Sequence, residues 1–266
     1  MKNILLLIPF FVLVSFIQQE KYYITFIKGT VLVQRTGKPV KIAETLLPSD
    51  KLIFKDSNAK LACISPGKGR FEISPVKSNN NSRGELIAVL KNILLPISNT
   101  YHLSTRSLII NGYDPETYFT CEETQNRILL LTDLPLPLIP SYNPDPNNFF
   151  FVQYTEDGKT ITRKIAQSEK GLLFSKSLFM EGTVIRIPKK VFICYQQKDA
   201  SGPHSSVLAE IIPVLSTVSE IRQQISLITK YSPSTNSKKL KAEIMSHLYD
   251  NYGKIGSEEI AYLSKK

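Results

Sequence analysis

Tryptophan is absent from this 266-residue chain, and histidine occurs only three times. The histidines are widely separated, at His102, His204 and His247. None lies in the His-Glu-x-x-His spacing that places two imidazoles on one helix face for zinc binding. The sequence therefore gives no support to a zinc hydrolase, nor to a dedicated sugar-binding module built on exposed aromatic rings.

Cysteine is as rare, with residues at positions 63, 121 and 194. An odd number of cysteines cannot pair completely, and their spacing matches no zinc or redox motif. Cys63 and Cys194 lie in apolar, strand-like runs, where a free cysteine often packs as a small hydrophobe. We predict that both are buried. The chain is not a disulfide scaffold, although export into an oxidising compartment would allow one disulfide bond.

Recognisable catalytic motifs are lacking too. No Gly-x-Ser-x-Gly sequence presents a serine nucleophile. The segment Ser65-Pro-Gly-Lys-Gly-Arg70 resembles a phosphate-binding loop, but it lacks the Walker spacing and precedes a strand-like run rather than a helix. We predict a tight turn, whose backbone N–H groups beside Lys68 and Arg70 form a candidate anion contact.

The carboxylates offer no acid/base pair. Those at positions 122–123 and 258–259 are adjacent in sequence, and neighbouring strand residues point to opposite faces. We therefore predict a protein that is not an enzyme and has no catalytic residue, cofactor or metal site.

The formal net charge is +10. From Lys159 to Lys190 alone there are eight Lys or Arg residues against two acids. These charges alternate with strand-like apolar residues, which is typical of the solvent face of a sheet, whereas nucleic-acid binding needs cations gathered on one surface. We predict no nucleic-acid partner; anionic envelope material suits the charge better.

The N-terminus has the pattern of an export signal. Met1-Lys2-Asn3 precedes an uncharged apolar run from Ile4 to Ile17, which is short for a membrane-spanning helix. Residues 1–19 are predicted to be a signal peptide or an N-terminal anchor. The protein is then exported to the periplasm or cell envelope, and it contacts the membrane only through this segment if the segment is not cleaved.

Residues 20–75 read as short strands separated by turns. Apolar runs of three to six residues alternate with turn formers such as Thr36-Gly-Lys-Pro39 and Pro66-Gly-Lys-Gly69. Strands this short at this spacing predict a small β barrel or sandwich.

Residues 76–132 are predicted to be a linker with a short helix and a strand. Ser82 and Glu85 have capping-box spacing, and the apolar residues from Leu86 to Ile93 recur with helical period. Five prolines follow in residues 133–147. They predict a stiff, extended connector at a domain boundary.

Residues 148–215 are predicted to be a second β-sandwich-like domain. Phe149–Tyr154 and Thr160–Ile165 flank an Asp157-Gly158 pair, a strong hairpin signal. Residues 216–266 are predicted to be a helical tail, either packed on the second β domain or docking another protein. The apolar residues that recur on its second helix form the candidate docking face: Leu240, Ile244, Leu248 and Tyr252.

Within residues 21–75, four segments carry a family pattern. They are Lys28–Arg35, which contains Gly29-Thr-Val31, then Gly37–Val40, Leu47–Leu52 and Asn58–Leu61. Their order resembles FecR-like periplasmic domains, although Pro48-Ser-Asp50 stands where a Gly-Asp pair is usual. The resemblance implies an exported β domain that transmits signals or binds envelope components, and it assigns no functional residue.

The predicted fold class is mainly β with a helical C-terminal tail (α+β). The leading hypothesis for function is an exported, non-enzymatic binding or scaffolding protein that engages another cell-envelope protein. One alternative is a periplasmic sensor that relays the binding of an anionic ligand. The other is a hydrolase of envelope polymers, which would gather His204 with carboxylates such as Asp157 or Glu210.

Overall fold

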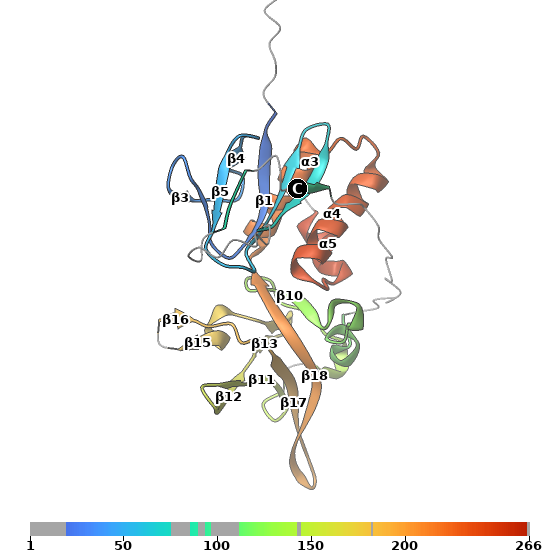
Figure 1. The fold of residues 1–266 in the computed structure, drawn as a ribbon. Helices are drawn as coiled ribbons and strands as arrows, with labels where there is room; N and C mark the ends of the chain where they lie inside the picture. The colour runs from blue at the N-terminus through green and yellow to red at the C-terminus, as the bar shows by residue number, and fades with distance from the viewer. Residues whose placement is uncertain are drawn as a thin grey trace, which may run out of the picture.

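The computed structural model describes residues 20–75, 86–89, 94–96, 112–142, 145–181 and 183–264. The predicted N-terminal segment and most of the predicted linker lie outside these ranges. The fold is mainly β with a helical C-terminal region, which confirms the predicted class. Figure 1 shows two parts along the long direction of the molecule: a first β region flanked by the C-terminal helices, and a second β region beyond β10.

The first β region contains two facing sheets. One has the strand order β4-β1-β6-β7-β9 and the other β3-β2-β5-β8. Fully buried side chains such as Ile24, Phe54 and Leu61 fill the space between them. The sheets do not close, so the sandwich alternative holds and the barrel does not. The strands are β1 (Tyr22–Lys28), β2 (Val31–Val33), β3 (Lys38–Pro39), β4 (Thr45–Leu46), β5 (Lys51–Phe54), β6 (Lys60–Ser65), β7 (Gly69–Ile73), β8 (Leu86–Val89) and β9 (Leu94–Pro96).

The helix predicted from Leu86 to Ile93 is wrong. Leu86–Val89 is strand β8, which pairs antiparallel with β5, and Leu94–Pro96 is β9, which pairs with β7. The apolar run satisfies either periodicity over so few residues. Pairing with strands distant in sequence decides between them, because tertiary context overrides weak helix propensity.

The second β region is built on a five-stranded sheet of order β10-β18-β17-β11-β12. Strand β10 runs parallel to β18, and the other neighbours are antiparallel. Two short ladders, β13-β14 and β15-β16, complete it. The strands are β10 (Arg127–Leu131), β11 (Phe149–Glu156), β12 (Lys159–Lys164), β13 (Ala166–Ser168), β14 (Gly171–Leu173), β15 (Met180–Glu181), β16 (Val184–Ile185), β17 (Val191–Asp199) and β18 (Gly202–Ser216).

The predicted hairpin is confirmed between β11 and β12. Glu156 pairs with Lys159, and both Asp157 and Gly158 have positive φ, at 48° and 76°. Two positive φ values in a two-residue loop define the turn whose twist matches that of the flanking strands.

Part of the proline-rich segment packs against the second core. Leu136 and Leu172 exchange backbone hydrogen bonds of 2.8 and 2.9 Å. A Cβ atom on Gly171 would lie 1.8 Å from the Leu136 carbonyl oxygen, so only glycine allows this approach. Short helical segments cover the same core: α2 (Pro115–Tyr118), η1 (Glu122–Thr124), η2 (Pro140–Tyr142) and η3 (Lys176–Phe179).

The C-terminal region contains α3 (Val218–Tyr231), α4 (Ser237–Tyr252) and α5 (Ser257–Leu263). The predicted capping box is present: Glu220 N–H donates to the Thr217 hydroxyl, and the Glu220 carboxylate accepts from Thr217 N–H. None of the helices in the described part of the chain is long and apolar enough to cross a membrane.

One of the two predictions placed these helices on the second β region alone. The structure shows instead that they pack on both β regions. Their apolar faces share a buried cluster with Phe26 of β1, Ala62 of β6 and Leu129 and Leu131 of β10. The tail therefore joins the first sandwich to the edge strand β10 of the second sheet (Figure 1).

Candidate binding surface on the second sheet

The candidate anion contact is divided by the fold. Lys68 lies on the surface with its Nζ atom 2.7 Å from a Glu20 carboxylate oxygen. The Arg70 side chain is only 1% exposed and lies 3.9 Å from the carboxylates of Glu243 and Asp250. Arg70 is thus a structural charge between β7 and α4, and the predicted contact loses one of its two cations.

The candidate docking face on α4 is largely covered inside the chain. Leu248 is fully buried and Tyr252 is 6% exposed, both in the cluster beneath the helices. Leu240 and Ile244 are half-buried. The face packs on the protein's own first sheet, because Phe26 and Ala62 present an apolar surface there.

The residues considered for a hydrolase are not brought together. His204 lies near the tip of the β17–β18 hairpin, with a Ser201 hydroxyl 2.8 Å from its Nε2 atom. Glu210 lies six residues along the same strand, about 20 Å away at roughly 3.3 Å per residue, beside Lys190. Asp157 lies in the separate β11–β12 turn.

Two buried polar clusters, around Glu259 and His247, could not be predicted from the sequence. The Glu259 carboxylate accepts hydrogen bonds from the hydroxyls of Tyr118 (2.7 Å) and Tyr113 (2.8 Å). Burial raises the pKa of Glu259, and the two hydroxyl donors oppose that rise. Nothing in the sequence relates α5 to the segment near α2, so no local signal pointed to this cluster. Glu259 is 6% exposed, and both hydroxyl donors hold its carboxylate inside the fold.

The second cluster surrounds His247, which is fully buried. Its Nε2 atom lies 2.9 Å from the Gln224 side-chain oxygen. Burial, followed by the nearby charges of Arg70 and Lys60, lowers the pKa of His247 to about 3. In the described ranges, no group of three or more His, Cys, Asp or Glu side chains is placed to hold a metal ion.

An apolar surface lies on the outer face of the second sheet. Phe150 and Val152 of β11 point into the core, so Phe149 and Phe151 point to the opposite face, where they are half-buried. Phe192 of β17 pairs with Glu210 of β18 and is 36% exposed. Val207 of β18 is 60% exposed.

The tail covers only part of this outer face. Leu129, Leu131 and Val214 belong to the cluster beneath the helices, so α3–α5 shield the side of β10 and the end of β18. Phe192 and Val207 lie on the remaining side. We call the group Phe149, Phe151, Phe192 and Val207 the outer apolar face.

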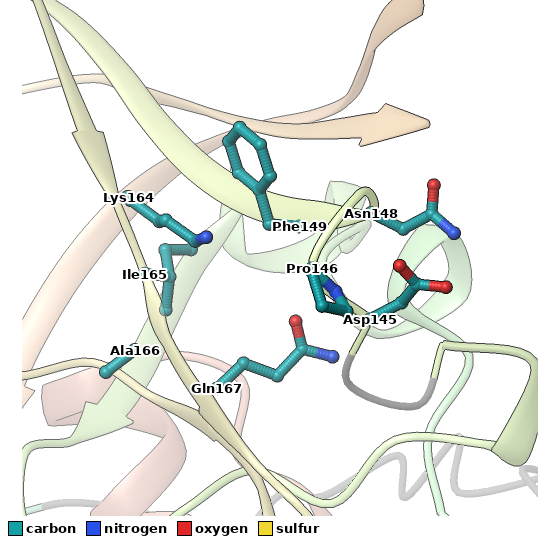
Figure 2. Close-up of a pocket in the computed structure, with 8 residues that line it drawn as sticks. All are labelled: Asp145, Pro146, Asn148, Phe149, Lys164, Ile165, Ala166 and Gln167. Atoms are coloured by element: carbon teal, nitrogen blue, oxygen red, sulfur yellow. The ribbon is translucent and has the colours of Figure 1, made fainter. Parts of the chain in front are cut away.

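A pocket of about 520 Å³ lies at one end of this face, between the start of β11 and the end of β12. Figure 2 shows Lys164 and Phe149 on one side and Asp145 with Asn148 across from them. The Lys164 ammonium lies 4.3 Å from the centre of the Phe149 ring, a cation–π contact. The pocket is lined by Asp145, Pro146, Asn148, Phe149, Lys164, Ile165, Ala166 and Gln167.

The polar groups of the pocket are only partly used within the fold. Asn148 accepts the Lys198 N–H through its side-chain oxygen (3.0 Å), which directs its amide N–H₂ elsewhere. Gln167 donates from its side-chain nitrogen to the Tyr142 carbonyl (2.6 Å) and keeps an acceptor oxygen. An aromatic ring, the Lys164 cation and the Asp145 carboxylate therefore line one concave site, which offers both charges to a bound group.

Comparisons with protein-family models, curated proteins and solved structures find no match. The FecR-like resemblance stays a prediction. Function is accordingly inferred from the surface itself.

The outer apolar face had a signal in the sequence. Three consecutive phenylalanines at 149–151 cannot all face one core, because alternate strand residues point to opposite faces. Aromatic residues in strand runs are usually core residues. That general rule predicted a core position for all three phenylalanines, whereas Phe149 and Phe151 lie on the outer face.

Proposed function

We propose that this chain is an exported, non-enzymatic binding protein of the cell envelope. It engages another envelope protein through the second sheet, using the outer apolar face and the adjoining pocket. The observation that carries the proposal is the exposure of Phe192 and Val207 on a sheet face that the tail covers only on its β10 side.

The energetics favour a partner on this face. Burying a fully exposed aromatic or branched aliphatic side chain stabilises a complex by about 1.5–3 kcal/mol, and Phe192 and Val207 retain a substantial part of that exposed area. Aromatic residues surrounded by polar groups are typical of the centres of protein interfaces. Lys164 and the Lys190–Glu210 pair supply that polar surround.

The cellular location rests on the predicted N-terminal signal or anchor in residues 1–19. The alternative of a sensor for an anionic ligand has less support, because Arg70 is buried and paired with Glu243. Lys164 in the pocket is a better-placed cation, and it belongs to the same sheet as the outer apolar face.

A comparison of tagged variants tests this function. Envelope material would be crosslinked and purified with the wild-type chain, with a Phe192→Ser, Val207→Ser double variant, and with Tyr262→Ser as the matched control. Tyr262 is 41% exposed on α5 and is not part of the outer apolar face. We expect wild type and control to recover one discrete envelope protein that the double variant loses. Equal recovery by all three chains would contradict the assignment of the face.

A further inference from the structure

We propose that the partner binds by adding an extended strand to β12, and that this strand carries acidic side chains. The inference rests on the proposed function and names how the second sheet engages its partner. Strand addition supplies affinity through main-chain hydrogen bonds, and alternate side chains of the added strand supply specificity.

The backbone of β12 has an open side. Ile165 N–H donates to the Phe150 carbonyl at 2.9 Å, which fixes the alternation of the ladder between β11 and β12. Since antiparallel pairs alternate, the N–H and C=O groups of Thr160, Thr162 and Lys164 point away from β11. Within the described residues, β12 is the last strand of its sheet and no strand pairs with this side.

The side chains of β12 select the charge of an incoming strand. Lys159, Arg163 and Lys164 are exposed, and the strand contains no acid. Cations on an edge strand oppose pairing with another cationic edge, so they disfavour a second copy of this chain. The same cations favour an acidic segment, because complementary charge promotes encounter and fixes register.

Apolar groups flank the open edge on both faces of the sheet. On the outer face, Phe151 lies opposite Lys164 in the ladder. On the inner face, Arg163 donates to the Met180 carbonyl at 3.4 Å, which places the β15–β16 hairpin beside β12 (Figure 1). Three aliphatic side chains in and after this hairpin are 44–53% exposed: Val184, Ile185 and Ile187.

This geometry predicts the composition of the added strand. Its side chains would alternate between the outer face, near Lys164 and Phe151, and the inner face, near Arg163 and the hairpin. Each face offers both a cation and an apolar surface. A segment that mixes glutamate or aspartate with valine, isoleucine or leucine fits, whereas a basic segment does not.

The test uses the full chain and a synthetic peptide of alternating glutamate and valine, with alternating lysine and valine as the charge control. Thr162→Pro removes an N–H that points away from β11, so the fold keeps its own ladder. Thr162→Ala is the matched control, because it keeps that N–H. We expect Thr162→Pro to weaken binding of the acidic peptide by about tenfold or more, and Thr162→Ala to leave it within about twofold.

A charge-reversal variant covers the case in which proline disturbs the sheet. Arg163→Glu with Lys159→Glu leaves every backbone group in place. We expect this variant to lose the acidic peptide and to gain binding of the lysine–valine peptide. If neither Thr162→Pro nor the charge reversal changed the affinity for the acidic peptide, the proposal would be overturned. So would a dimer of the pure protein that Thr162→Pro converts to monomer, because the edge would then belong to a second copy.

The two proposals fail in different ways. Recovery of an envelope protein that depends on Phe192 and Val207 but not on Thr162→Pro would keep the proposed function and refute strand addition. Loss of peptide binding in Thr162→Pro, without recovery of any envelope protein, would support the open edge and refute the proposed function.

Discussion

Replacing Leu248 by alanine tests whether the C-terminal tail is part of the folded core. Leu248 is fully buried in a cluster that also contains Phe26 of the first sandwich and Leu131 of β10. A buried leucine replaced by alanine destabilises a protein by about 2–5 kcal/mol, depending on how far the surroundings collapse into the cavity. Because the cluster that contains Leu248 includes residues from two separate sheets, we expect little collapse and a loss of about 3 kcal/mol or more.

The assay is urea unfolding, followed by circular dichroism and by tyrosine fluorescence, since the chain has no tryptophan. Leu240→Ala is the matched control: it is the same change on the same helix at a half-buried position, and we expect a loss of about 1 kcal/mol or less. Such a large loss from Leu248→Ala would remove a major part of the 5–15 kcal/mol of a typical domain. Equal, small losses in the two variants would refute the packing of the tail.

Three further predictions concern stability. Thr217→Ala removes the capping box of α3 and should lower the free energy of unfolding by about 1 kcal/mol in the same assay. Gly171→Ala forces a Cβ onto the Leu136 carbonyl and should lower the thermal midpoint, whereas Gly158→Ala, with open space around it, should lower it less. Below pH 6.5, His247 binds a proton in the unfolded state but stays neutral in the folded state, where its pKa is about 3. Stability should therefore fall from pH 6.5 towards pH 4, more steeply than in His247→Gln.

Local features of the fold could be predicted from the sequence. The Asp157-Gly158 hairpin and the capping box at Thr217 each depend on residues within one turn, and the structure has both. Burial of Cys63 and Cys194 followed from their apolar neighbours, and both are buried. Such features are set by short-range conformational preferences, which act whatever the rest of the chain does.

Features that join distant segments could not be predicted. Arg70 becomes a buried charge because Glu243 and Ser246 of α4, more than 170 residues later in the chain, lie beside it. The apolar run at Leu86–Val89 becomes a strand because β5 offers a partner. The docking face expected on α4 is covered because the first sheet has an apolar outer surface at Phe26. Periodicity identifies an apolar face but does not name what covers it.

The outer apolar face and the open edge of β12 are the central claim, and site-specific photo-crosslinking in intact cells tests it most directly. A photo-reactive residue would be placed at position 207 on the outer face, at position 162 on the edge, and at position 38 on the exposed strand β3 as the control. We predict that positions 207 and 162 crosslink to the same envelope protein and that position 38 does not. Crosslinks from position 38 alone, or equally from all three positions, would contradict the assignment of the binding surface to the second sheet.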